Sequence, residues 1–130
     1  MTKAIKKDKK LYFFDWTMIQ EPGIRFENLL AVSLLRMAAR LTEKGLGEFE
    51  VRYLRDREKR EIDFVLVKNQ HPVALIEGKR GDKIISRQGK YFSERLRIPF
   101  YQIVHRAEKV EAHPGNCFII PAINFLMLAG

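Results

Sequence analysis

The spacing of apolar residues predicts an amphipathic helix over Ile24–Leu41. Apolar side chains recur there at intervals of three and four residues, which places them on one face of an α-helix. The recurring residues are Phe26, Leu30, Leu34, Met37 and Leu41. Glu27 falls in the same sector and is its one charged residue. A carboxylate on a buried face needs a partner or a metal ion, unless it lies at the edge of that face and reaches water.

Apolar and aromatic runs bounded by turn residues predict six strands. They are Leu11–Trp16, Phe49–Arg55, Glu61–Lys68, Val73–Lys79, Phe100–His105 and Cys117–Ile120. The pattern also predicts a basic helix over Ile84–Arg97 and a short apolar helix over Ala122–Leu128. Glu21-Pro22-Gly23 is typical of a break before the first helix, and Asn69–Pro72 of a turn.

The predicted order of elements is β-α-β-β-β-α-β-β, which favours the α/β class with a mixed central sheet flanked by helices. With 130 residues, the chain has the length of one domain. We expect a flexible basic arm over residues 1–10 and a single domain over residues 11–130, because Met1–Lys10 holds five lysines and one aspartate.

The charge balance changes the picture by favouring polyanionic partners. Lys and Arg number 24 against 16 acids, a net charge of +8. Such a balance favours DNA first and a membrane surface second, although surplus lysine can also serve solubility alone. The single cysteine, Cys117, excludes a disulfide framework. The apolar stretch Cys117–Leu128 is too short to span a bilayer, and no secretory signal is recognisable, so we expect a cytoplasmic protein.

Two acids and a lysine interrupt otherwise apolar predicted strands. Asp63 lies within Glu61–Lys68, whereas Glu77 and Lys79 end the next strand and point to the same face of it. If residues i and 140 minus i of this hairpin face each other, Asp63 lies opposite Glu77, about 4.5–5.5 Å away between Cβ atoms. That register requires an odd loop or a β-bulge. Two such carboxylates need a cation between them, which can be Mg²⁺ or Mn²⁺, or Lys79 in a structural ion-pair network.

The same residues carry a family resemblance. A Glu on the first helix, followed by Asp and by Glu-x-Lys on consecutive strands, resembles the PD-(D/E)XK nuclease superfamily, whose core is α-β-β-β-α-β. Four segments are also similar to the C-terminal domain of unknown function carried by many archaeal and bacterial AAA-type ATPases. These segments are Lys10–Asp15, Arg25–Leu29, Arg60–Leu66 and Ala74–Lys79.

The resemblance implies a restriction-endonuclease-like core and a set of site residues. Asp63, Glu77 and Glu27 would bind Mg²⁺ or Mn²⁺, and Lys79 would position the attacking water. Gln88 shares a helix face with Tyr91 and would orient the site, although it can equally be a surface residue. Four further residues would contact DNA phosphates without reading sequence. They are Arg80, Lys83, Arg87 and Lys90.

The chain departs from the family pattern at three points. It has no phosphate-binding loop of the Gly-x-x-x-x-Gly-Lys-[Ser/Thr] type, so the ATPase part is absent from it. Ile62 stands where the superfamily has proline, and Gly78 stands between Glu77 and Lys79, where glycine weakens a strand. Three hypotheses therefore follow: a metal-dependent deoxyribonuclease, a non-catalytic relic that binds DNA or protein, and an interaction domain that dimerises through Phe118–Leu128.

Overall fold

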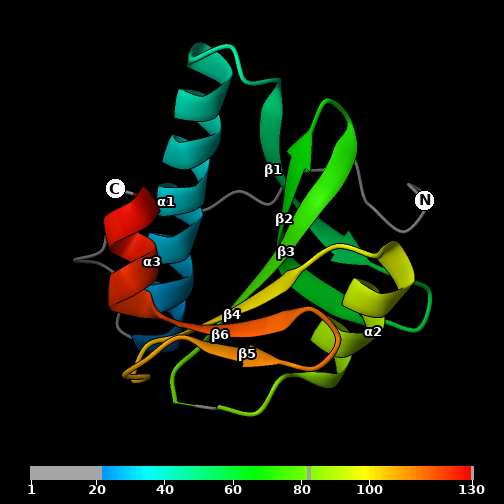
Figure 1. Cartoon of the computed structure of the whole chain (residues 1–130), viewed down its shortest axis with the longest axis vertical. Helices are drawn as coiled ribbons and strands as arrows, with labels where there is room; N and C mark the ends of the chain where they lie inside the picture. Colours follow the sequence, from blue (N-terminus) through cyan, green and yellow to red (C-terminus); the bar gives the residue numbers. More distant parts are fainter. Residues whose placement is uncertain (1–21, 82, 130) are drawn as a thin grey trace.

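Six strands form one mixed sheet flanked by helices in the part of the chain that the structure describes (Figure 1). The structure is a computed structural model, and it describes residues 22–81 and 83–129. The predicted strand Leu11–Trp16 and the basic arm Met1–Lys10 lie outside these residues. The predicted α/β class with a mixed sheet is thereby confirmed.

The elements follow the predicted order closely. They are α1 (Pro22–Glu43), β1 (Phe49–Arg55), β2 (Glu61–Lys68), β3 (His71–Lys79), α2 (Arg87–Leu96), β4 (Phe100–Val104), β5 (Glu111–His113), β6 (Cys117–Pro121) and α3 (Ala122–Ala129). Strand β5 is an addition to the prediction, because a three-residue strand is too short to leave an alternating pattern. Helix α2 begins three residues later than predicted, since Ser86 caps it.

The strands lie in the order β1-β2-β3-β4-β6-β5. The first three are antiparallel neighbours, whereas β3, β4 and β6 run parallel to one another, and β5 pairs antiparallel with β6. The carboxyl ends of β3, β4 and β6 therefore meet at one edge of the sheet. Ligands of open α/β sheets commonly bind beyond such an edge.

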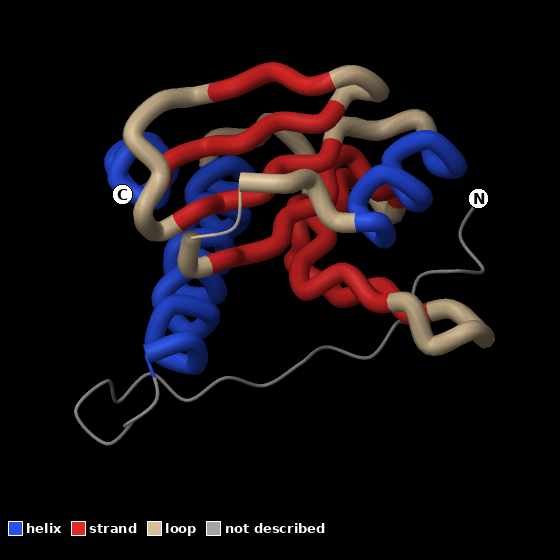
Figure 2. Tube along the Cα trace, turned by 90° about the horizontal axis from the view of Figure 1, so that it is seen from below, coloured by secondary structure: helices blue, strands red, loops and turns tan. Residues whose placement is uncertain are grey.

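Two apolar cores lie on opposite faces of the sheet. Helices α1 and α3 lie side by side over one face, and α2 covers the other (Figures 1 and 2). On the α1 side, Leu30 and Leu34 pack against Phe64 and Ile76. On the α2 side, Phe92 packs against residues such as Val65 and Leu75, and Cys117 is buried there as a core residue.

Helix α1 begins at Pro22, so the expected break over Glu21-Pro22-Gly23 is wrong at Pro22 and Gly23. Proline is compatible with the first turn of a helix because the backbone N–H that it lacks would have no helical partner there. A glycine in the left-handed backbone region follows the end of the helix. Gly45 has a φ of +78°, and Leu46 N donates to Leu41 O at 3.1 Å.

The hairpin between β2 and β3 has the register that the sequence predicted. Phe64 pairs with Ile76 and Leu66 with Ala74, and a bulge follows between Leu66 and Val67. The predicted irregularity is thus confirmed. The connection is shorter than the predicted Asn69–Pro72, because Asn69 and Gln70 alone form the turn with φ of 48° and 69°.

Gly78 lies where helix α1 packs closely on strand β3. A Cβ atom built on Gly78 would lie 2.6 Å from Leu30 Cδ1 and 3.1 Å from Phe26 Cε2. Gly78 therefore has a packing role against α1 that the sequence analysis did not predict. Its missing side chain lets α1 approach the sheet closely.

Candidate functional site

Glu77 is a buried carboxylate on β3 whose two oxygens both accept hydrogen bonds. Its exposed fraction is 3%. Ser86 Oγ donates to Oε1 at 2.8 Å, and Gln88 Nε2 donates to Oε2 at 3.2 Å. Gln88, which the family resemblance assigned to the site, thus contacts Glu77 directly. The donors come from the start of α2, so Glu77 joins β3 to that helix.

Ser86 is the N-cap of α2 and serves three contacts. It has an extended backbone, its hydroxyl accepts from Gly89 N at 3.1 Å, and its own N–H donates to Gln102 Oε1 at 3.1 Å. Gln102 is fully buried on β4 and donates through Nε2 to Ile84 O at 2.9 Å. A polar network thus fixes the loop between β3 and α2 onto the sheet.

Burial raises the pKa of Glu77 above the ordinary value of a glutamate. The hydrogen bonds from Ser86 and Gln88 and the charge of Lys79 act in the opposite direction, but they offset the desolvation only in part. The protonated form is therefore easier to reach here than in water.

Asp63 lies half-buried on β2, close to an irregularity of that strand. Val65 pairs with Arg52 of β1 and Ile62 pairs with Leu54, so two β2 residues, Asp63 and Phe64, stand against Tyr53 alone. This arrangement is a β-bulge, a feature that commonly redirects one side chain. The β2–β3 ladder is described from Lys68 to Phe64, and Asp63 and Glu77 are the next positions on its register.

Glu27 lies on α1, which packs on the face of the sheet opposite to the donors of Glu77. It is half-buried, as its place on the apolar face of the helix predicted. Over residues 22–81 and 83–129, no group of three or more His, Cys, Asp or Glu side chains is placed to hold a metal ion. Asp63, Glu77 and Glu27 are thus not gathered into one such group in the described part of the chain.

The predicted phosphate-contacting residues are exposed on the segment that follows β3. Arg80 and Lys83 lie in the loop, and Arg87 and Lys90 lie one turn apart on α2. Lys79 is half-buried at the end of β3. Arg80 and Lys83 therefore lie close to the carboxyl end of β3. Lys90 lies elsewhere, because it lines a pocket with Cys117 at the amino end of β6, which runs parallel to β3 and β4.

Helix α2 is also held by the connection between β1 and β2. The guanidinium of Arg60 lies 3.7 Å from the ring centroid of Tyr91, and its Nε donates to Asp56 Oδ2 at 2.7 Å. Desolvation by itself would raise the pKa of Asp56. The hydrogen bonds from the side chain and backbone of Arg60, together with its charge, outweigh that effect and lower the pKa. Tyr91, which the sequence analysis grouped with Gln88, thus has a packing role against Arg60.

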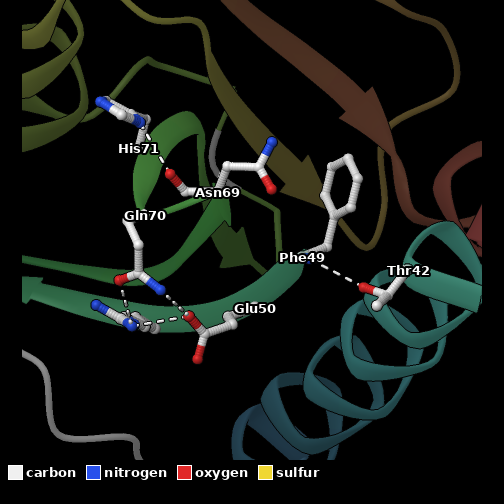
Figure 3. Close-up of polar contacts among 7 residues, drawn as sticks. Thr42, Phe49, Glu50, Asn69, Gln70 and His71 are labelled. Atoms are coloured by element: carbon white, nitrogen blue, oxygen red, sulfur yellow. Dashed lines mark hydrogen bonds and ion pairs between the residues drawn. The ribbon is translucent and has the colours of Figure 1, made fainter. Parts of the chain in front are cut away.

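A second polar cluster lies at the opposite end of β3, around the β2–β3 turn (Figure 3). Arg52 Nη2 donates to Glu50 Oε2 at 2.8 Å and to Gln70 Oε1 at 3.3 Å. Phe49 N donates to Thr42 Oγ1 at 2.9 Å, which ties β1 to the end of α1. These contacts pair each charge with a neighbour, so this cluster is structural.

Ser86 and Gln102 are the site residues that the sequence analysis missed. Ser86 carried a recognisable signal, because serine followed by a helical pattern is the usual N-cap signature. Gln102 carried another, since it is the one polar side chain in the apolar run Phe100–Val104.

A pocket of about 520 Å³ lies beside α2, lined among others by Ser93, Arg97 and Cys117.

Comparison with known proteins identifies the family. A family model described as a domain of unknown function (DUF4143) matches residues 23–124, which is more than half of the chain. The chain belongs to the DUF4143 family. The predicted resemblance to the C-terminal domain of AAA-ATPase-associated proteins is thereby confirmed. Neither the curated proteins nor the solved structures give a match.

The DUF4143 match includes every predicted site residue, from Glu27 to Lys90. Among the helices that the structure describes, none combines the length and the apolar character needed to cross a membrane. The apolar helix α3 leaves Ile123, Met127 and Leu128 largely exposed, at 66%, 77% and 83%. This is the segment for which the sequence analysis suggested dimerisation.

Proposed function

We propose that this DUF4143 domain is a DNA-binding module with a nuclease-like frame, in which Glu77 anchors helix α2 instead of binding a catalytic metal. The single observation that carries the proposal is the environment of Glu77. Its carboxylate is 3% exposed and both of its oxygens accept hydrogen bonds from Ser86 and Gln88. An acid that the protein itself satisfies in this way has a structural role without any ion.

The element order supports the nuclease-like frame. Helix α1, strands β1–β3, helix α2 and strand β4 follow the α-β-β-β-α-β order of the superfamily that the sequence resembles. The exposed basic residues of the loop after β3 and of helix α2 support DNA as the partner. Backbone phosphates recruit such side chains without regard to sequence, and the resulting affinity falls steeply with salt.

Magnesium-dependent hydrolysis of DNA is the second candidate, and one observation favours it. Gln88 contacts Glu77, and Lys79 lies two residues after Glu77 on the same strand, as the superfamily resemblance implies. Asp63 and Glu77 would then hold Mg²⁺ or Mn²⁺ as a two-carboxylate site. Glu77 would have to share its oxygens with Ser86 and Gln88.

One set of assays separates the two candidates. Binding of a fluorescent DNA duplex is measured by anisotropy over a salt series, with Mg²⁺, with Mn²⁺ and with EDTA. Cleavage of linear, circular and single-stranded DNA is followed under the same conditions. We expect salt-dependent binding that neither EDTA nor Asp63→Ala changes, and no cleavage. Cleavage that is lost in both Asp63→Ala and Lys79→Ala would overturn the non-catalytic proposal in favour of the nuclease.

A further inference from the structure

Arg80 and Arg106 are held next to each other beyond the parallel ends of β3 and β4. The ladder of these strands ends at Lys79 and Val104. Two further backbone hydrogen bonds follow it, from His105 N to Lys79 O at 2.9 Å and from Arg106 N to Arg80 O at 3.0 Å. Arg80 therefore stands level with His105, and Arg106 is one residue further along. The backbone of both arginines is therefore fixed at the spacing of neighbouring strands, about 4.8 Å.

These two arginines differ from those of the β1–β2 hairpin in their pairing. Arg52, Arg55 and Arg60 each form an ion pair with a carboxylate, at 2.7 to 3.0 Å. Arg80 and Arg106 are both exposed, and no carboxylate within residues 22–81 and 83–129 forms an ion pair with either.

The local surroundings add positive charge to this position. In the sequence, three lysines lie close to the two arginines, against two acids. The lysines are Lys79, Lys83 and Lys109, and the acids are Asp82 and Glu108. His105 lies against Phe26, with ring centroids 5.3 Å apart, so the turn that carries Arg106 also contacts α1. The arginine pair is thus presented by backbone that α1 and β3 hold in place.

We propose that Arg80 and Arg106 together bind one phosphate group of a DNA backbone, beyond the carboxyl ends of β3 and β4. The inference rests on the proposed DNA binding and adds Arg106, which lies far from Arg80 in the sequence. Guanidinium groups suit this role because they donate several hydrogen bonds in a plane that matches phosphate oxygens.

The test is a double-mutant cycle read by the salt dependence of DNA binding. Each phosphate contact contributes about 0.9 to the slope of log K against log salt concentration for duplex DNA. Arg106→Ala, Arg80→Ala and the double variant should each reduce the slope by about 0.9, because all three lose the same phosphate. Arg106→Lys should keep the slope while it weakens binding. Arg36→Ala, an exposed arginine of α1, is the control and should leave the slope unchanged.

The outcomes keep this inference separate from the proposed function. If Arg87→Ala lowers the slope but Arg106→Ala does not, the arginine pair is refuted and DNA binding stands. Additive losses in the double variant would show two separate phosphate contacts and would also refute the pair. If the wild-type chain binds DNA without salt dependence, both the proposed function and the pair are refuted. Circular dichroism of each variant checks that the fold is retained.

Discussion

Glu77 and Gln102 lie opposite each other on the parallel strands β3 and β4, and both hold the segment that leads into α2. Glu77 accepts from the hydroxyl of Ser86, whereas Gln102 accepts from its backbone N–H and donates to Ile84 O. Both side chains are almost completely buried. A buried polar pair of this kind fixes one arrangement of the loop, because any other leaves several polar groups without partners.

Ser86→Ala should destabilise the fold by about 1–3 kcal/mol, since it removes an N-cap and a donor to a buried carboxylate at once. The cap accepts from Gly89 N, and the donor bond goes to Glu77. Ser86→Thr keeps the hydroxyl and is the control. Urea unfolding followed by circular dichroism measures both variants. Equal stability of Ser86→Ala and wild type would contradict the role given to Ser86.

The raised pKa of Glu77 predicts a stability gain on acidification. The folded state binds a proton at a higher pH than the unfolded chain does, for which the ordinary value is 4.5. The free energy of unfolding should therefore increase as the pH falls from the raised pKa of the folded state towards 4.5. Below 4.5 both states are protonated at this residue, and the contribution of Glu77 stays constant. Glu77→Gln should lack this contribution.

The measurement is the difference in unfolding free energy between wild type and Glu77→Gln over a pH series. Taking the difference cancels the contribution of groups such as Asp56, whose lowered pKa costs stability only in stronger acid. A difference that does not change with pH would refute the assignment of this proton uptake to Glu77.

Gly89→Ala should destabilise the protein although alanine is the better helix former. A Cβ atom at Gly89 would clash with the ring of Phe100. Overpacking costs about 1–3 kcal/mol, which exceeds the gain of about 1 kcal/mol in helix propensity. Gly81→Ala is the control, because a Cβ there meets nothing within 4 Å. Recovery of stability by Phe100→Leu in the Gly89→Ala background would identify the clash as the cause.

Divalent metal should leave the melting temperature unchanged if Glu77 is a structural anchor. A metal that binds only the folded state would add RT ln(1 + [L]/Kd), about 2.7 kcal/mol at a hundredfold excess over Kd. Thermal unfolding with Mg²⁺, Mn²⁺ or EDTA measures this directly. A rise with Mn²⁺ that Asp63→Asn abolishes would instead support the two-carboxylate metal site.

Local pattern was sufficient to predict most of the fold. The bounds of β1 and β2 follow from apolar runs that turn residues interrupt, and the register of β2 with β3 was predicted together with its bulge. The bulge that β2 forms against β1 at Asp63 had no such signal. This bulge depends on how β1 pairs with β2, and the alternation of apolar and polar residues within one strand does not reveal the pairing.

The candidate site was predicted in part for a similar reason. Glu77 was identified by residue type and its place on a strand, and Gln88 by the family resemblance. The structure brings the two into contact. Their link through Ser86 to Gln102 joins segments that are distant in sequence, so it appears only once α2 docks. Gly78 and Gly89 show the same limitation, because the space they leave is filled by α1 and by Phe100.

The separation of the sheet into an antiparallel part and a parallel part has a kinetic consequence. Strands β1–β3 are joined by short turns, so their pairing closes small loops. Pairing of β4 with β3 instead closes a longer loop, which contains the whole of α2. We expect the transition state for folding to contain the β1–β3 meander, with α2 and β4 docking afterwards. Substitutions at Ser86 and Gly89 should then accelerate unfolding and leave the folding rate nearly unchanged.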